Sequence, residues 1–545
     1  MDLLDVRPPF RMAVDVRDQR PLPAPAPTIG SSASRETAPS GSLQLSWRPG
    51  LRRQARLYLA PVLRKARPTA LIAAVAALLW LIFPFGFPNY DTAYALLWGN
   101  ELAHGISPDY GATLPPTPHP LADVWGALLS PFGPSAAADA TSALAYLALG
   151  AIGYLVYRLG ALWFDRAIGL TAAAIVLTRD SYISTGLRAY IDAPYIALAL
   201  VALVLETRRP RAGWPVLALL ALAGLLRPEA WLFSAAYLAY LLLERDPKPG
   251  RLALRRRGDL RRSHVVALVA LAASAPVVWG LFDLITAGDP IYSFTGTRES
   301  VRTLHRQTGL VGLVRYGPRH LAEVLEWPGN LGAALGGALG LALLPRRSAI
   351  GVAAALLALA AFAILAVAGL AVISRYTLLA GALLAIFCAA GLLGWRLIDA
   401  GHPWRRRWQL CAAAVAVLFV IWIPIDYDEL SSVRTELDNE HRVVGDLHNL
   451  VDSVAFRAEC GPVSVPNYRA VPWVASWLDL RPAQINSSTE PRPPSRGYFL
   501  DPTSQFVIHR FLLDPADSRR PVIKVPPRFR LVLANESWKV YARCR

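Results

Sequence analysis

Two carboxylates lie where apolar segments of this sequence meet polar connections, and both could do acid–base chemistry. Asp91 follows the apolar run 68–88, within FPNYDTAYALLWGNELAHG, and Asp192 begins the apolar run 191–206, within RAYIDAPYIALAL. A carboxylate at a membrane boundary is costly to desolvate and is by default a candidate functional residue. We predict that Asp91 and Asp192 are both site carboxylates. The structural alternatives are a capping or turn role for Asp91 and a favourable helix-dipole contact for Asp192.

The connection 89–136 carries further candidates. It contains no Lys or Arg, and its polar side chains include Glu101, His104 and His119. Connections of more than about 15 residues are usually functional or disordered, and the stretches AYALLWGNELA and LADVWGALLSPF predict short interfacial helices. For Glu101 a solvated helix face is the alternative. A lone loop histidine is seldom a metal ligand, so we predict no cofactor and no metal site, with a divalent metal as the alternative.

Cations gather in the later connection 286–330 and at the start of a later apolar run. A guanidinium pairs bidentately with phosphate oxygens, so these residues are candidates for binding a phosphate group. The alternative is unselective contact with anionic lipid headgroups. Arg227 and Glu229, on either side of Pro228, are expected to form a structural ion pair. The predicted phosphate-binding residues are Arg298, Arg302 and Arg375.

These residues are set among apolar runs that recur along most of the chain. The sequence is 54% hydrophobic and only 17% charged. Runs of this length and composition predict an all-α polytopic membrane domain over residues 68–425. The net charge of +17 is spread in short groups between the runs, so we predict no nucleic-acid partner. About eleven spans are expected, at 68–88, 137–157, 167–180, 191–206, 213–227, 229–244, 264–285, 331–345, 349–370, 375–394 and 409–425.

The two ends of the chain differ from this middle. Residues 1–50 are rich in Pro, Ser, Ala and Arg and predict a disordered tail, and 51–67 form a basic juxtamembrane segment. Residues 426–545 predict a small soluble α/β domain: a long amphipathic helix, a strand at CGPVSVP, a helix at YRAVPWVASWLDL, and two strands in FRLVLANESWKVYARC. Cys460 and Cys544 stand at its first and last strands. They are expected to form a disulfide in an oxidising compartment, with unpaired thiols as the alternative.

Charge asymmetry gives the topology. Alternate connections hold 25 and 9 Lys and Arg residues, and the richer set is expected in the cytoplasm. The N-terminus is then cytoplasmic, and an odd number of spans places 426–545 outside. An even number would return that segment to the cytoplasm.

Several of these features together resemble the GT-C glycosyltransferases. They are the carboxylate after the first span, the interfacial helices, the second carboxylate in the next outer connection, LLRPEAWLF at 225–233 and SRYTLL at 374–379. The similarity covers roughly 68–425. Within that superfamily, the chain resembles more specifically the bacterial members related to the dolichyl-phosphate-mannose mannosyltransferases and the aminoarabinose transferases.

The resemblance implies a multi-pass enzyme at the outer face of a bacterial plasma membrane. It would transfer a sugar, with inversion, from a polyprenyl-phosphate donor to an envelope glycan, lipid or protein. It gives Asp91 the role of catalytic base and maps the second carboxylate onto Asp192 or Asp180. Many members have Asp-Glu or Asp-x-Asp after the first span, whereas Thr92 follows Asp91 here. That departure weighs against a metal-assisted variant.

Two other classes of function compete with this interpretation. One is a polytopic transporter or lipid flippase, and the other is a non-catalytic envelope-assembly protein. Transporters usually place ionisable groups near the bilayer midplane and show paired halves. The acidic residues here gather at one face of the predicted membrane domain, which disfavours transport.

Overall fold

The computed structural model describes residues 68–245, 254–256, 261–454, 456, 460–487, 495–512 and 525–544. The tail predicted at 1–50 and the basic segment predicted at 51–67 lie outside these residues. The chain divides into two units, 1–70 and 71–545. Apart from the first three residues of the first helix, everything discussed below belongs to the second unit.

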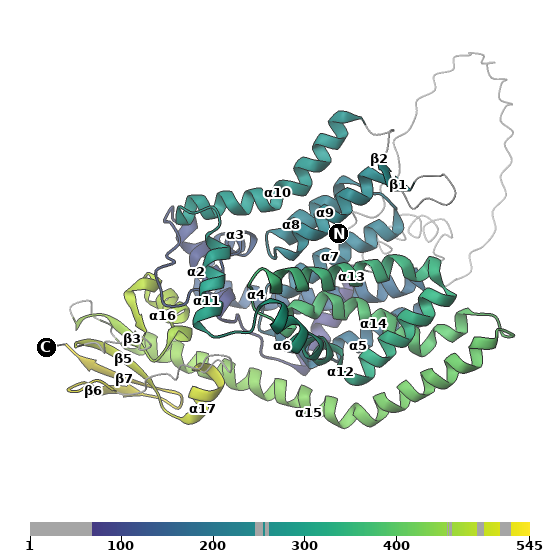
Figure 1. Ribbon diagram of the computed structural model, residues 1–545. Coiled ribbons are helices and arrows are strands. Elements are labelled where there is room, and N and C mark those ends of the chain that lie inside the picture. The colour runs from purple at the N-terminus through teal and green to yellow at the C-terminus, as the bar shows by residue number, and fades with distance from the viewer. Residues whose placement is uncertain are drawn as a thin grey trace, which may run out of the picture. The chain divides into compact units, whose positions relative to one another are not determined.

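Most of the described chain is helical (Figure 1). A first helix runs over Pro68–Ile82. The helices that follow are α2 (Tyr90–Ala103), α3 (Pro120–Leu129), α4 (Pro134–Trp163), α5 (Arg166–Leu177), α6 (Asp180–Leu187), α7 (Asp192–Arg208), α8 (Trp214–Gly224), α9 (Glu229–Leu242), α10 (Arg262–Ala287), α11 (Tyr292–Thr303), α12 (Gly309–Leu343), α13 (Pro345–Val367), α14 (Leu378–Leu393), α15 (Pro403–Ser453), α16 (Val471–Leu478) and α17 (Gln505–Val507). Short 3-10 turns include η2 (Ser374–Thr377) and η3 (Gly394–Leu397), and β1 (Leu243–Arg245) and β2 (Leu254–Arg256) form a small hairpin.

Five helical segments of the described chain are long and apolar enough to cross a membrane. They are α4, α10, α13, α15 and the segment Ser374–Leu397, which joins η2, α14 and η3. A sixth arises if α6 and α7, bent by 113°, count as one broken span. The remaining apolar helices, such as α5 and α8, are shorter. The protein is therefore embedded in a membrane, while the expected number of eleven spans stays a prediction.

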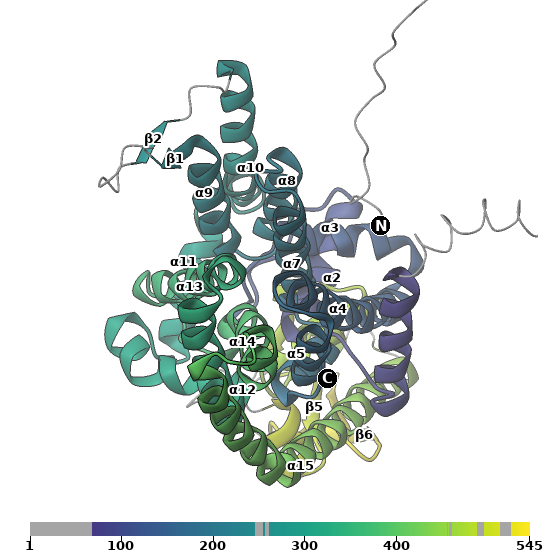
Figure 2. The same cartoon turned by 90° about the vertical axis from the view of Figure 1, so that its right-hand side faces the viewer.

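The centre of the helical region is α14, which neighbouring helices surround (Figure 2). Of the apolar part of Ser374–Leu397, 83% is buried, against 17% for α10 and for α15. Its contact with α12 requires glycine: a Cβ on Gly336 would lie 1.8 Å from the Phe387 carbonyl oxygen. Small residues of this kind let membrane helices approach backbone to backbone. This contact fixes η2, which lies directly before α14 and carries Arg375.

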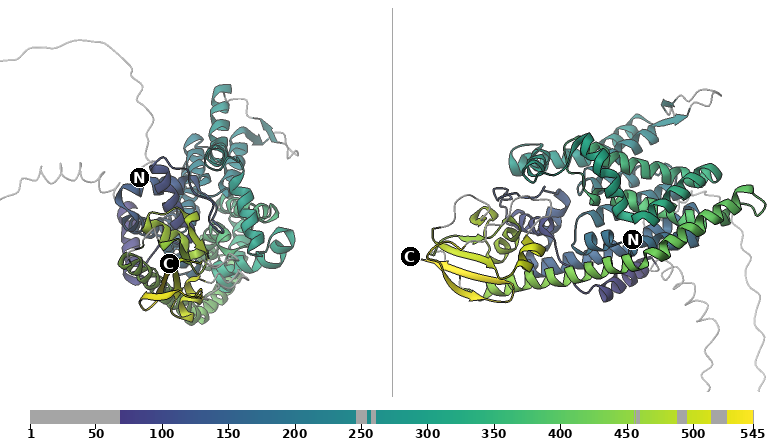
Figure 3. Two further views of the ribbon diagram at one scale, coloured as in Figure 1. Left: turned by 90° about the vertical axis from the view of Figure 1, so that its left-hand side faces the viewer. Right: turned by 60° about the horizontal axis from the view of Figure 1, so that its bottom comes forward.

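α15 runs as one helix of 51 residues, so the predicted domain boundary at 425/426 falls inside it. In Figures 1 and 3 it extends from the helical region to the C-terminal sheet. The amphipathic helix expected after residue 426 is therefore a continuation of the last apolar segment. Its C-terminal turns bury Val443, Leu447 and Leu450 against the sheet.

The C-terminal sheet has five strands in the order β4-β3-β5-β7-β6. β3 pairs in parallel with β4 and β5, and β7 pairs antiparallel with β5 and β6. The predicted strand at CGPVSVP is confirmed as β3, the helix at YRAVPWVASWLDL as α16, and the final two strands as β6 and β7. The central strand β5 was not predicted. The bounds are β3 (Val463–Val465), β4 (Ile485–Ser487), β5 (Gly497–Pro502), β6 (Arg530–Ala534) and β7 (Trp538–Arg543).

The sheet shares its hydrophobic core with the first polar connection. Tyr94 and Trp98 of α2 are almost completely buried in the same cluster as strand residues such as Val465. The structure records a disulfide between Cys460 and Cys544, which joins the segment before β3 to the residue after β7. The helices predicted at AYALLWGNELA and LADVWGALLSPF are confirmed as α2 and α3. Asp91, in the first turn of α2, is consequently held between the membrane helices and the sheet.

Candidate active site

Asp91 lies on a cavity of about 940 Å³. Apolar lining comes from α9, α10 and α13, through residues such as Leu232, Gly280 and Ile364, beside the acidic Glu229 and Asp283. Another part of the lining comes from the C-terminal region and from α15. Its side chains, which we call the C-terminal wall, are Tyr468, Arg469, Trp473, Phe511 and Glu440.

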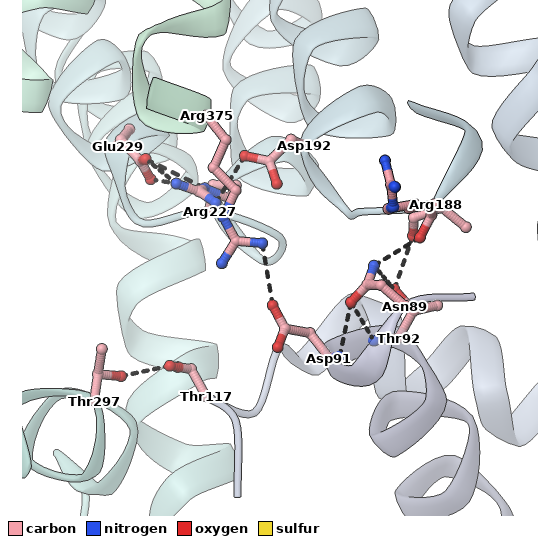
Figure 4. Close-up of polar contacts among 11 residues, drawn as sticks. Asn89, Asp91, Thr92, Thr117, Arg188, Asp192, Arg227, Glu229, Thr297 and Arg375 are labelled. Carbon is pink, nitrogen blue, oxygen red and sulfur yellow. Dashed lines mark hydrogen bonds and ion pairs between the residues drawn. The ribbon is translucent and has the colours of Figure 1, made fainter. Parts of the chain in front are cut away.

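The first turn of α2 is attached to the connection before α7. Asn89 caps the helix, since its Oδ1 accepts hydrogen bonds from the Asp91 amide at 2.7 Å and the Thr92 amide at 3.3 Å. The Asn89 Nδ2 donates to the Arg188 carbonyl at 2.8 Å, and the Thr92 hydroxyl donates to the Ala189 carbonyl at 2.8 Å (Figure 4). Thr92 therefore attaches α2 to the connection before α7. The position that carries a second acid in the resembled family has a structural role here.

Asp91 forms an ion pair that faces the cavity, which we call the open pair. Arg375 Nη1 donates to Asp91 Oδ2 at 3.1 Å, although the two residues are 284 positions apart. The side chain of Asp91 is 27% exposed and that of Arg375 is 24% exposed. The Arg375 guanidinium carbon also lies 4.5 Å from the centre of the Tyr190 ring. The aromatic ring orients the guanidinium and leaves part of it available to a ligand.

A second cluster of opposite charges lies beside the open pair and is nearly closed to solvent (Figure 4). Arg227 contacts Asp192 Oδ1 at 2.8 Å and Glu229 Oε1 at 2.6 Å, and all three side chains are at most 6% exposed. We call these residues the buried triad. The expected Arg227–Glu229 pair is present, but its extension to Asp192 was not predicted. Asp192 does not line the cavity, whereas Arg227 and Glu229 do.

The two clusters meet at an aromatic ring. Tyr376 lies 4.2 Å from the Arg227 guanidinium carbon and 5.9 Å from that of Arg375. Cation–π contacts of this kind hold a guanidinium in place without neutralising it. Two guanidiniums, each also paired with carboxylate, are therefore held in fixed orientations next to Asp91.

His119 is the only predicted histidine that lines the cavity. Burial lowers the pKa of His119 to about 3, and the Arg227 and Arg375 charges act in the same direction. Its ring contacts the Trp279 ring edge-on, with 5.4 Å between centres. The imidazole is therefore neutral at physiological pH, and can exchange hydrogen bonds but not a charge with a ligand.

The other two first-connection candidates lie away from the cavity. Glu101 accepts a hydrogen bond from the Asp109 amide at 2.8 Å and lies 3.7 Å from Arg481. His104 is exposed at the end of α2, where its ring contacts the Asn100 carbonyl at 2.8 Å. Both side chains therefore form hydrogen bonds within the connection 89–136.

The three predicted phosphate-binding arginines do not come together. Arg375 belongs to the open pair, whereas Arg298 and Arg302 line a second, smaller pocket. Sequence reasoning also missed the cavity positions of Tyr190 and Tyr376, although each is close in sequence to a predicted residue. Nothing in the linear pattern indicated the C-terminal wall.

Among the described residues, one group of three acids has oxygen atoms close enough to share an ion: Asp180, Glu326 and Glu429. These residues do not line the cavity. Arg179 lies beside the group, 3.3 Å from Glu326, and makes a bidentate contact with Asp426. The group is thus an acidic cluster with an adjacent guanidinium, separate from Asp91.

Comparisons with known proteins agree with this architecture. The sequence matches no protein-family model and no curated protein sequence. The fold is similar to the crystal structure of ArnT from Cupriavidus metallidurans bound to undecaprenyl phosphate, with a TM-score of 0.50 and 13% identity over 88% of this chain and 98% of that one. The oligosaccharyltransferase of Archaeoglobus fulgidus in its apo form gives a TM-score of 0.42, with 10% identity over 78% of this chain and 65% of that one. The resemblance inferred from the sequence is therefore borne out at the level of the fold, which this chain shares with ArnT.

Proposed function

We propose that this protein transfers a sugar, with inversion, from a polyprenyl-phosphate donor to an acceptor hydroxyl. The observation that carries the proposal is the open pair: a carboxylate and a guanidinium face one cavity at the junction of apolar helices and a polar wall. The fold shared with ArnT, whose crystal structure holds undecaprenyl phosphate, supports the choice of donor. The sugar and the acceptor class, whether envelope glycan, lipid or protein, are left open.

The open pair provides both charges that such a transfer needs. A donor phosphate oxygen binds Arg375 and replaces the Asp91 carboxylate there, since arginine binds phosphate in a fork geometry. Asp91, released from its partner, accepts the proton of the acceptor hydroxyl. The acceptor oxygen bonds to C1 as the C1–O bond to phosphate breaks, and the electron pair leaves on the lipid phosphate. Arg375 stabilises that developing charge, so the reaction requires no cofactor.

The buried triad acts by holding neighbouring side chains in position. Asp192 and Glu229 hold the Arg227 guanidinium against Tyr376, which in turn contacts Arg375. Asp192 is therefore a positioning carboxylate, and Arg227 acts by holding Tyr376 in place beside Arg375. This assignment keeps both predicted carboxylates but gives them different tasks.

The two walls of the cavity fit two substrates of different chemistry. The polyprenyl chain would lie along the apolar wall of α9, α10 and α13, and the acceptor would enter from the C-terminal wall. Aromatic and arginine side chains suit a polar, hydroxyl-bearing acceptor. The proposal places the cavity at the outer face of a bacterial plasma membrane, with the N-terminus in the cytoplasm and the C-terminal sheet outside.

The test is mass spectrometry of polyprenyl-phosphate sugars and envelope glycans in a strain that lacks the protein. One lipid-linked sugar should accumulate while one linkage is lost. Wild-type protein and D139N, which changes an exposed Asp outside the cavity, should restore both pools, and D91N should restore neither. Unchanged pools in the deletion strain would overturn the proposal.

A further inference from the structure

A second pocket, which we call the basic pocket, adjoins the cavity. Its volume is about 430 Å³, and Val301 and Arg306 line both spaces. Three arginines and a histidine make up most of its lining, and none of the described lining residues is acidic. The residues that line it are Arg298, Val301, Arg302, His305, Arg306, Thr308 and Gly369.

The walls of the basic pocket are held by backbone hydrogen bonds. At the end of α11, the His305 amide donates to the Arg302 carbonyl and the Arg306 amide to the Val301 carbonyl, both at 3.0 Å. Across the pocket, the Val372 amide donates to the Gln307 carbonyl at 2.8 Å. The segment after α11 is therefore attached to the segment before η2, and the basic side chains are mounted on fixed backbone.

Arg298 is oriented before any ligand arrives. Gly369 has φ +93°, and a Cβ there would lie 3.0 Å from the Arg298 Nε, so the guanidinium rests against a position that only glycine suits. The ring of Phe294 lies 5.5 Å from the guanidinium carbon on another side. A pre-oriented guanidinium loses less conformational entropy on binding an anion.

Arg302 is the exchangeable cation of this pocket. It forms an ion pair with Glu299 at 3.7 Å, and the two side chains are 68% and 71% exposed. Exposed pairs of this kind contribute about 0.2–1 kcal/mol, so a phosphate can replace the carboxylate with little loss. Two guanidiniums on successive turns of α11 then face one anion.

We propose that the basic pocket binds the phosphate group of a lipid at a site separate from the phosphate site proposed at Arg375. Planar guanidiniums on an acid-free lining select phosphate oxygens, which they can contact bidentately. The phosphate can come from a polyprenyl phosphate or from a bilayer phospholipid, since both present the same group at headgroup depth. Binding at this pocket does not depend on the proposed reaction.

The experiment counts bound lipids on the full-length protein by native mass spectrometry in neutral detergent. The probes are undecaprenyl phosphate and phosphatidylglycerol, each titrated separately, with phosphatidylcholine as the reference lipid. Removal of both guanidiniums in R298Q/R302Q should weaken one bound probe by about tenfold or more. R302Q, which changes a largely exposed side chain, should weaken the same probe by a smaller factor if the double variant does not fold.

R315Q is the matched control, because Arg315 is an exposed arginine on α12 that lines neither pocket. R375Q should keep the phosphate lipid of the basic pocket, so a failure of the proposed reaction would leave this result intact. Loss confined to undecaprenyl phosphate assigns the site to polyprenyl lipids, and loss confined to phosphatidylglycerol assigns it to bilayer phospholipid. Unchanged binding in R298Q/R302Q, or equal losses in R315Q and R302Q, would overturn the proposal.

Discussion

The open pair and the buried triad use the same chemical groups in opposite ways. Asp91 and Arg375 are each about one-quarter exposed, whereas Arg227, Asp192 and Glu229 are nearly inaccessible. An accessible pair can exchange one partner for a ligand, because solvent screens part of the loss. A buried cluster cannot, since removal of one member leaves an uncompensated charge in a medium of low dielectric. Accessibility, and not residue type, therefore separates the group that we propose reacts from the group that we propose supports it.

The largest expected effect tests the reactive side of this comparison. D91N should lower sugar transfer by about 10²–10⁴-fold, the range associated with loss of a general base. The free energy of unfolding should change by less than about 1 kcal/mol, because the open pair is partly exposed. Turnover of a polyprenyl-phosphate sugar and thermal unfolding in detergent measure the two quantities. Transfer by D91N at the wild-type rate would remove the distinction.

Removal of the central charge of the buried triad should act mainly on stability. R227M leaves Asp192 and Glu229 buried without their cation, and we expect a loss of about 3–5 kcal/mol in the free energy of unfolding. The triple variant D192N/R227M/E229Q removes all the charges and should recover part of that loss. If R227M is as stable as the wild type, the triad is not the support described here.

A conservative change in the open pair should have an intermediate effect. R375K keeps the charge but loses the planar fork that contacts phosphate oxygens. We expect the KM for the lipid-linked donor to rise about tenfold, equivalent to about 1.4 kcal/mol, with unchanged thermal stability. Steady-state kinetics at varied donor concentration measure this. A fall in kcat at constant KM would place Arg375 in the transition state alone.

The smallest expected effect, per unit of pH, is on the stability contribution of His119. Burial and the arginines of both clusters lower the pKa of this residue. The pKa of His119 is about 3 in the folded protein, and about 6.5 is usual in an unfolded chain. Between these values the unfolded state binds the extra proton, so stability falls as pH decreases below about 6.5. The slope is at most about 1.4 kcal/mol per pH unit. H119Q should flatten the dependence of thermal unfolding on pH, whereas H104Q, at an exposed position, should leave it unchanged.

The sequence was most informative where local pattern decides structure. Apolar runs located the five long apolar helical segments, and the position of Asp91 after the first run identified a residue that lies on the cavity. Alternating residues in the C-terminal region located β3, β6 and β7. β5, with the sequence GYFLDP, is buried along its whole length and has no alternation to reveal it.

Contacts between distant parts of the chain could not be predicted from the sequence. Arg375 was predicted as an outer cation, but its pairing with Asp91 depends on the close contact of α12 and α14 that places η2. Arg298 and Arg302 were grouped with it by charge, and only the fold separates them. Asp192 was predicted as a site carboxylate because it begins a helix at the membrane boundary. Its burial behind Arg227 could not be derived from that position.

The length of α15 has a mechanical consequence. At 1.5 Å per residue its 51 residues extend about 75 Å, and Glu440 of the C-terminal wall lies toward its C-terminal end. Arg188, which borders the cavity, fastens this end through Glu436 and Glu440. The apolar first part of α15 and the cavity-lining Glu440 therefore belong to one continuous helix. A tilt of that apolar part would be transmitted to Glu440, and the Arg188 contacts oppose this movement.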